Sequence, residues 1–353
     1  MPAKSKSIMH DVKIVRPSDH SNWNTLLDAE AGFSIFHTAE WAEILTRSYG
    51  YRPAYFVCRG EKGVESLLAV MEVKSRLTGI RGVSLPFTDA CEPVAADAQT
   101  FQKLWDHAVS LGGKRKWKYL EIRGGQNQLA DKPPSAVHIG HRLDLSRGMD
   151  AIYAGLRDST RRNIKKARSE KVEVNIANTL PAMEDFCRLN AMTRKEHGLP
   201  PQPRRFFQQL YDRVISRNMG FIAQASVADT VVAANVYLHF GREVVYKYGA
   251  SDKRFQHLRA NNLVMWESIK WSCDRGFQSL NFGRTEPEHK GLLQFKAGWG
   301  ANPYQIFYYR YDLQKKVFMA DLPGVHPLAK KIFNKLPLPV LKTLGGFLYR
   351  HMG

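Results

Sequence analysis

The 353-residue sequence contains few cysteines and no long hydrophobic run. The cysteines are far apart and form no CxxC pair; they are Cys58, Cys91, Cys187 and Cys273. This spacing disfavours a disulfide framework and a zinc site, and it indicates a reducing, cytoplasmic compartment. No apolar run approaches the ~20 residues that cross a bilayer, and the N-terminus lacks the apolar core of a secretory signal. An integral membrane protein and a conventionally secreted protein are therefore disfavoured.

The sequence also lacks the common motifs of nucleotide-binding and hydrolytic enzymes. It contains no GxGxxG, no GxxxxGK[ST], no GxSxG and no HExxH. These absences argue against a Rossmann or P-loop fold, a serine hydrolase of the elbow type and a zinc protease. No helix-turn-helix or zinc-finger pattern is apparent, so sequence-specific DNA binding is not expected. No metal site is predicted.

Acidic residues are scarce relative to basic ones, and the imbalance lies in one half of the chain. The sequence has 52 Lys and Arg against 33 Asp and Glu, a net charge of +19. Residues 1–150 hold 20 basic and 17 acidic side chains, whereas residues 151–353 hold 32 and 16. The second half is therefore expected to meet nucleic acid, anionic lipid or a phosphorylated substrate. A non-enzymatic nucleic-acid or membrane-binding protein is one reading of this charge.

The densest basic cluster lies at residues 157–171, in the stretch LRDSTRRNIKKARSEK. Its apolar spacing predicts a helix. Three basic residues share one face of that helix, at i, i+4 and i+7: Arg161, Lys165 and Arg168. A solvated face usually alternates charges of both signs, and this one does not. The pattern favours phosphate binding over a plain solvated face.

A second basic region is the C-terminal tail, residues 313–353, with seven basic residues and one acid. Its apolar residues alternate with the basic ones, and Pro337 and Pro339 are expected to divide it into two short amphipathic pieces. Such a segment can lie on an anionic membrane surface. The alternative is a C-terminal helix that packs on its own domain.

The two halves of the chain show a similar order of expected elements: strand, two helices, antiparallel strands, helix, strand. This order predicts an α+β fold with mixed sheets, and the repetition is compatible with a duplicated unit. In the second half, helices are expected on both sides of a loop at residues 197–203, whose three prolines exclude a helix.

A family resemblance becomes visible in the second half, in YKYGASDKRFQHLRANNLVMWESIKWSCDRGFQSLNFGRTEPEHKGLLQFKAGWG. The stretches FHTAEWAEILTRSYGYRPAYF, VKSRLTGIRGVSLPF and YLEIRGG precede it in the expected order. Over residues 12–312 the chain resembles the FemAB/FemX transferases that build peptidoglycan bridges. It is most similar to the FemAB-like proteins of exopolysaccharide and PEP-CTERM systems. The resemblance implies two tandem GNAT-like acyltransferase domains, at 1–145 and 146–312, followed by the tail at 313–353.

The resemblance also implies an activity, namely aminoacyl transfer from tRNA to an amine of a lipid-linked or nucleotide-sugar envelope precursor. Such an enzyme needs no cofactor, and it is expected in the cytoplasm or at the inner face of the plasma membrane. An alternative is an N-acyltransferase that takes acyl-CoA or an acyl carrier and modifies an exopolysaccharide or lipid precursor. Acyl-CoA would then be a co-substrate. Residues 253–260 contain none of the glycines of the usual CoA loop, which counts against this alternative.

The resemblance places candidate site residues around the FK motif. Lys296 matches the lysine at the transfer site, where it can hold a phosphate or stabilise an oxyanion, and Phe295 precedes it. Arg284, in the FGR motif, suits a bidentate phosphate or carboxylate contact. Asn281 takes a position where relatives often have Asp.

Further candidates lie at strand ends and in loops. Tyr248 ends a strand that faces the acyl donor in GNAT folds. Asp89 is a candidate for acid–base work or acceptor binding, and Arg123, at the end of a strand, is a candidate for the cleft. Arg254 and His257 lie where an acyl-CoA-dependent GNAT enzyme binds pyrophosphate.

Overall fold

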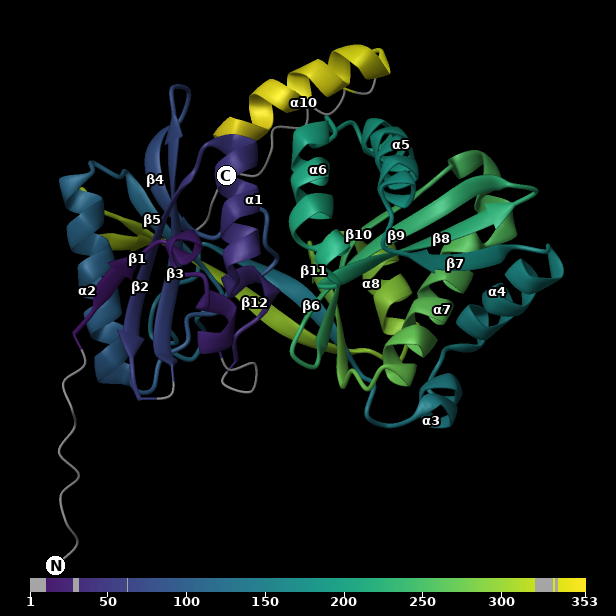
Figure 1. Ribbon diagram of the computed structural model, residues 1–353, viewed down its shortest axis with the longest axis horizontal. Helices are drawn as coiled ribbons and strands as arrows, with labels where there is room; N and C mark the ends of the chain where they lie inside the picture. The colour runs from purple at the N-terminus through teal and green to yellow at the C-terminus, as the bar shows by residue number, and fades with distance from the viewer. Residues whose placement is uncertain (1–10, 28–31, 62, 321–332, 334–335) are drawn as a thin grey trace, which may run out of the picture.

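In the computed structural model, which describes residues 11–27, 32–61, 63–320, 333 and 336–353, thirteen strands form one continuous mixed sheet (Figure 1). The order across the sheet is β1-β2-β3-β4-β5-β12-β6-β11-β10-β9-β8-β7, and β13 pairs with β12. The strands are β1 (Lys13–Val15), β2 (Arg52–Arg59), β3 (Val64–Ser75), β4 (Gly79–Ser84), β5 (Tyr119–Arg123), β6 (Ala136–Asp144), β7 (Glu173–Ala177), β8 (Gly220–Val227), β9 (Thr230–Phe240), β10 (Glu243–Ser251), β11 (Ser279–Thr285), β12 (Asn302–Asp312) and β13 (Val317–Met319). The helices are α1 (Ala39–Tyr49), α2 (Ala98–Lys114), α3 (Met149–Ala154), α4 (Asp158–Ser169), α5 (Leu180–Glu196), α6 (Arg204–Arg213), α7 (Ala260–Asp274), α8 (Lys290–Ala297) and α10 (Leu338–Met352).

Two central strands join the halves of this sheet. β12 comes late in the chain, yet it lies between β5 and β6 and is antiparallel to both. Each half contains one parallel pair, β4 with β5 and β10 with β11. The predicted α+β fold with mixed sheets is confirmed. The predicted domain limits stay a prediction, because the sheet runs without a break through β6 and β12.

A shared hydrophobic core holds the two halves together. Helices α1 and α6 meet at the junction, in the middle of Figure 1. The ring of Phe206 lies 6.2 Å from Trp41 and 5.8 Å from Tyr49, measured between ring centroids. All three side chains are almost completely buried. Because aromatic side chains bury large apolar areas, this cluster fixes the relative position of the halves and of the loops between them.

Local sequence signals explain both ends of α1. Thr38 caps α1 by accepting a hydrogen bond from the Trp41 N–H, and Gly50, at φ +74°, ends the helix. The helix predicted in the basic stretch at residues 157–171 is α4, and the chain breaks between it and α3, where the Arg157 N–H donates to the Gly298 carbonyl. Before α1, the chain forms a 3-10 turn at Trp23–Leu26.

Within the C-terminal tail the structure describes β13 and the helix α10, and the first of the two expected amphipathic pieces falls mostly outside the described residues. Pro337 is the N-cap, and Pro339 lies in the first turn, where a missing N–H breaks no helical hydrogen bond. Residues 321–332 and 334–335 lie outside the described residues. Arg81 donates from Nε to the Gly353 carbonyl, 2.6 Å, and from Nη2 to the His351 carbonyl, 2.8 Å. The helix therefore packs on its own protein, which is the alternative that the sequence left open.

A close backbone approach holds α10 against the loop at residues 197–203. A Cβ added to Gly345 would lie 2.1 Å from the Pro201 carbonyl oxygen, whereas one added to Gly346 would meet nothing within 4 Å. Gly345→Ala is therefore expected to lower the free energy of unfolding by about 1–3 kcal/mol through overpacking. Gly346→Ala, the matched control, should leave it unchanged or raise it by up to about 1 kcal/mol. Urea unfolding and proteolysis of α10 measure both effects, and equal stabilities would contradict this packing.

Candidate active site

A cavity of about 600 Å³, here called the junction pocket, lies where β10 and β11 diverge. The two strands pair in parallel only over residues 243–245 and 279–281. Beyond these residues β10 pairs with β9 and β11 with β6. The opening lies at the carboxyl ends of parallel strands, a common ligand position in such sheets. Its lining comes from both halves and includes Phe87, Asp89 and Arg123 from the first and Lys247, Tyr248, Gly283, Arg284 and Lys296 from the second.

Two irregular strand segments shape the wall of the junction pocket. The pairing of β10 with β9 shifts register between Tyr246 and Tyr248, so that Lys247 is the extra residue of a bulge. The pairing of β11 with β6 shifts between Asn281 and Arg284, around Gly283. Gly283 has φ +67°, and a Cβ there would lie 2.8 Å from Asp89 Oδ2. Bulges re-aim side chains at active sites, and here glycine also lets the carboxylate approach the backbone.

Lys296 reaches the pocket from α8 and is buried. Its Nζ donates to the carbonyls of Gly283 and Arg284, at 2.8 and 3.1 Å. An ammonium group has three N–H donors, so one remains for a substrate. Burial lowers the pKa of Lys296 to about 8, although the negative charge of Asp89 opposes this. The side chain is therefore mainly an ammonium at neutral pH and loses its charge in mildly alkaline solution.

Asp89 and Lys247 form an ion pair across the two halves, with 3.2 Å between Oδ2 and Nζ. The Lys247 side chain is only 5% exposed. Its Nζ lies over three aromatic rings, at 5.3 Å from the centroid of Tyr248, 5.4 Å from Phe36 and 5.9 Å from Trp41. Burial disfavours the charged form of Asp89, but nearby lysine and arginine charges outweigh it and hold its pKa below the usual value. Burial lowers the pKa of Lys247 despite its partner.

Two arginines flank this pair and differ in how many of their N–H donors are hydrogen-bonded within the protein. The Arg123 guanidinium binds Glu121 at 2.9 Å and reaches the carbonyls of Leu85 and Thr88, so it holds the loop that carries Asp89. Arg284 is more exposed and donates to His138 Nε2 at 3.1 Å. Its guanidinium therefore keeps donors for a phosphate or carboxylate ligand.

Tyr248 lies on β10 among the rings of Phe186, Phe206 and Phe207. Burial, together with the negative charge of Asp89, raises the pKa of this phenol well above its ordinary value. The hydroxyl therefore stays protonated at neutral pH and can donate a hydrogen bond or a proton.

The other predicted residues lie outside the junction pocket. Asn281 accepts hydrogen bonds from the Gly283 N–H, 2.9 Å, and the Tyr304 hydroxyl, 3.3 Å, and so supports the bulge. On α4, Arg161 binds Asp158 and Arg168 binds Glu267, while Lys165 is exposed. Arg254 binds Asp252 at 2.6 Å, and His257 is exposed. None of these six lines either the junction pocket or the pocket described next.

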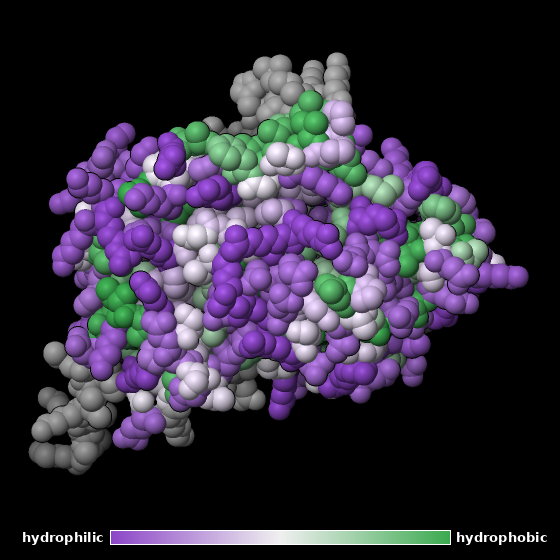
Figure 2. Space-filling view, turned by 45° about the horizontal axis from the view of Figure 1, so that its top comes forward, coloured by the Kyte–Doolittle hydropathy of each residue, from purple (hydrophilic) through white to green (hydrophobic). Residues whose placement is uncertain are grey.

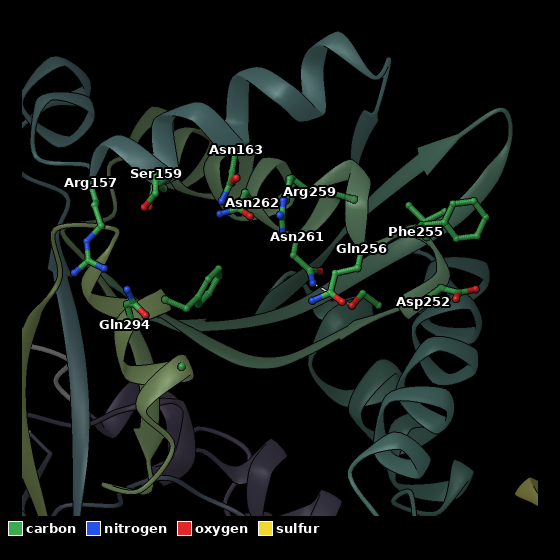
Figure 3. Close-up of a pocket in the computed structure, with 16 residues that line it drawn as sticks. Arg157, Ser159, Asn163, Asp252, Phe255, Gln256, Arg259, Asn261, Asn262 and Gln294 are labelled. Carbon is green, nitrogen blue, oxygen red and sulfur yellow. Dashed lines mark hydrogen bonds between the residues drawn. The ribbon is translucent and has the colours of Figure 1, made fainter.

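A second pocket, here called the polar pocket, has a volume of about 440 Å³ and lies on the other side of α8 (Figure 3). Phe295 and Gln294 line it from α8, and Arg157 and Asn163 line it from the region of α4. Arg259, with φ +59°, precedes the first turn of α7 and lines it from there. The face of α4 turned to this pocket thus carries Ser159, Thr160 and Asn163 rather than the predicted basic triplet.

Lys247 is the main site residue that sequence reasoning missed. Strict strand alternation would place it on the face opposite to Tyr246 and Tyr248, and no motif marks it. Side chains from the end of α5 and the following loop also line the junction pocket: Asn190, Thr193, Arg194, His197 and Gln202. The three prolines of that loop were the only sequence signal for this wall.

The described part of the chain contains neither a metal-binding cluster nor a membrane-spanning helix. In it, no group of three or more His, Cys, Asp or Glu side chains is arranged to hold a metal ion. None of its helices is long and apolar enough to cross a membrane.

Comparison with known proteins supports an acyltransferase fold. A family model described as an acetyltransferase (GNAT) domain matches residues 154–291. UDP-N-acetylmuramoylpentapeptide-lysine N(6)-alanyltransferase of Weissella viridescens is 25% identical over 153 residues, which make up 41% of this chain. The match spans 44% of that enzyme's length.

Solved structures extend the likeness to most of the chain. The crystal structure of FemX matches with a TM-score of 0.66 at 12% identity, over 84% of this chain and 96% of FemX. A tandem GNAT protein from the clavulanic acid biosynthesis pathway matches with a TM-score of 0.53 at 11% identity, over 86% and 99%. The fold is therefore the tandem GNAT fold that the resemblance predicted.

Proposed function

We propose that this chain, which has the tandem GNAT fold of FemX, is an acyltransferase that moves an aminoacyl group from tRNA to an amine of a cell-envelope precursor. The observation that carries the proposal is the junction pocket, in which Lys296, Asp89 and Tyr248 meet. The Weissella relative is named for alanyl transfer to the lysine of a UDP-linked muramoyl pentapeptide. That name supports an acceptor of the peptidoglycan type.

The reaction needs alignment, proton transfer and a stabilised oxyanion, but no covalent nucleophile. The acceptor amine attacks the ester carbonyl carbon, a C–N bond forms, and the ester C–O bond to the tRNA ribose breaks. The free N–H donor of Lys296 stabilises the oxyanion of the tetrahedral intermediate. Asp89 attracts the acceptor ammonium, which loses its first proton to solvent and attacks as the neutral amine. The nitrogen then gives a second proton to Asp89, the Tyr248 phenol protonates the departing ribose oxygen, and the proton on Asp89 restores the phenol.

An acyl-CoA donor is the second candidate, and the polar pocket is the observation that favours it. This pocket lies at the N-terminus of α7, where a helix can bind phosphate, and it carries Arg157 and Arg259. However, residues 253–258 form a 3-10 helix without glycine. A pyrophosphate therefore cannot approach the backbone as closely as it does in a glycine-rich loop. We therefore favour tRNA as the donor.

A donor-exchange assay tests the function. The purified chain is incubated with UDP-linked muramoyl pentapeptide and either alanyl-tRNA or acetyl-CoA, and the products are identified by mass spectrometry. The proposal expects a product with one added alanyl group from tRNA only. An acetylated product would support the CoA alternative, and no product with either donor would reject the UDP-linked form of the acceptor.

We also propose that the enzyme works in the cytoplasm at the inner face of the membrane and binds anionic lipid through α10. Hydrophobic residues lie along α10 in Figure 2, and Val340, Phe347 and Met352 are exposed there. Leu77, 62% exposed, is on the β3–β4 turn, which contacts the C-terminal end of α10. Basic side chains accompany these residues: Lys74, Arg76, Lys342 and Arg350 are exposed, and residues 338–353 contain no acid. Apolar residues rimmed by cations suit an anionic interface.

Removing the apolar residues of this surface should weaken membrane binding. The double variant Leu77→Ser, Phe347→Ser is expected to bind vesicles with 30% phosphatidylglycerol at least tenfold more weakly, since each buried apolar side chain contributes about 1.5–3 kcal/mol. Ile14→Ser is the control, because Ile14 is 48% exposed on β1, far from α10 (Figure 1). Vesicle co-sedimentation measures the affinities. Equal binding by the double variant and the control would contradict the assignment.

A further inference from the structure

An apolar groove lies beside the junction pocket, and the reaction at Lys296 does not use it. Its volume is about 550 Å³, within the range of small-molecule sites. Three elements form it: α5, the start of α6 with the preceding prolines, and α10. Its lining includes Leu180, Met183, Cys187, Ala191, Pro201, Pro203, Phe207, Lys342 and Thr343.

The floor of this groove is hydrophobic. Met183, Ala191 and Phe207 are each at most 3% exposed. Burial raises the pKa of the Cys187 thiol to about 12, so the side chain is a neutral, weakly polar part of the wall. A peptide segment would bring backbone N–H and C=O groups that such a floor cannot pair. A hydrocarbon chain has no such groups.

The groove adjoins the junction pocket. Asn190 and Gln202 line both cavities. Gln202 donates to the Tyr49 hydroxyl at 3.1 Å and is thereby held in place. Asn190 is 7% exposed, and its side chain makes no hydrogen bond within the described part of the chain. The amide N and O of Asn190 are not sealed inside the protein but face the two cavities, so they can hydrogen-bond to a ligand that passes from one cavity to the other.

The edge of the groove is predominantly basic. Arg188, Arg204 and Lys342 line it, against Glu184 alone. Arg204 binds Glu184 at 2.7 Å, and Arg188 binds Asp185 at 3.1 Å. Lys342 forms no ion pair with any described residue, so its charge remains for an anionic ligand.

We propose that this groove binds the hydrocarbon chain of a lipid phosphate acceptor. The chain lies on the apolar floor, the phosphate contacts the basic edge at Lys342, and the reacting end passes Asn190 into the junction pocket. The inference rests on the proposed function and deepens it, because it selects a lipid-linked acceptor over a chain-free one. The exposed apolar face of α10 next to the groove would let the chain enter from the membrane surface.

Direct binding of alkyl phosphates tests the proposal without any transfer reaction. Calorimetry with octyl, decyl and dodecyl phosphate, each below its critical micelle concentration, should show affinity that rises roughly fourfold per methylene until the groove is full. The heat-capacity change should be negative, as expected when apolar surface is buried. Inorganic phosphate alone should compete weakly, because it cannot use the floor.

Variants that fill the groove decide the assignment. Cys187→Trp should abolish the chain-length dependence and weaken dodecyl phosphate binding at least tenfold, while Cys187→Ala, the matched control, should retain both. Thr343→Trp, at an exposed position on α10, covers the groove without touching its core and serves if Cys187→Trp fails to fold. Absence of dodecyl phosphate binding, or equal chain-length dependence in both tryptophan variants and the unchanged protein, would overturn the proposal. The binding experiment contains no aminoacyl donor, so its result does not depend on the outcome of the transfer assay.

Discussion

Lys296→Met is expected to remove nearly all transfer activity while the protein stays folded. The free N–H donor of Lys296 is the only hydrogen-bond donor that the proposed mechanism gives to the oxyanion. Loss of one such donor typically lowers the rate about 10²–10³-fold. The methionine fills a similar volume, but the carbonyls of Gly283 and Arg284 lose the donor that they share, so the free energy of unfolding should fall by about 1–3 kcal/mol. Single-turnover rates of alanyl transfer, with thermal unfolding measured alongside, check both parts.

The pH profile separates this role from a structural one. Because the pKa of Lys296 is about 8, the ammonium predominates below that pH, and transfer should decline as the pH rises through it. Lys296→Arg keeps a positive charge that does not titrate in this range, so the remaining activity should lack the alkaline decline. If Lys296→Met retained more than a tenth of the activity, or if the decline survived in Lys296→Arg, the role in the oxyanion would be rejected.

Lys296 and Arg284 could be predicted as site residues from the sequence, because each belongs to a short recognisable motif. The FGR and FK motifs lie twelve residues apart, and the structure joins them through the hydrogen bonds from Lys296 to the Gly283 and Arg284 carbonyls. Asp89 comes from a distant segment, yet it reaches the same pocket because its loop packs against the bulge at Gly283. The sequence marked Asp89 only as a candidate for acid–base work or acceptor binding, and local periodicity could not show which residues it meets.

Features that depend on distant packing could not be predicted. Helix α4 was expected, but the face that it turns to the polar pocket is set by α7 and the chain near Gly298, not by its own charge pattern. The position of β12 between β5 and β6 depends on a pairing across more than 150 residues. In the tail, Pro337 and Pro339 lie at the N-cap and in the first turn of α10, but the packing of this helix on Arg81 could not be predicted from its own sequence.

Lys247→Met is expected to damage both stability and transfer. The substitution leaves the Asp89 carboxylate without the ammonium that lies 3.2 Å away, and breaking a buried pair in this way costs about 3–5 kcal/mol. Loss of this positive charge raises the pKa of Asp89. A reaction that needs the carboxylate fails as the pH falls through that pKa, so the acid limb of the rate profile should move to higher pH. Urea unfolding and kcat/KM between pH 5 and 8 measure the two effects.

The double variant Lys247→Met, Asp89→Asn distinguishes the two consequences. With both charges removed, no uncompensated carboxylate is buried, so the double variant should be more stable than Lys247→Met alone. Transfer should nevertheless stay at the level of Asp89→Asn, because the group that attracts the ammonium and takes its proton is absent. If the double variant regained activity together with stability, the ion pair would serve only to join the two halves. If Lys247→Met shifted the acid limb and the double variant abolished it, Lys247 would be the residue that keeps Asp89 ionised for the reaction.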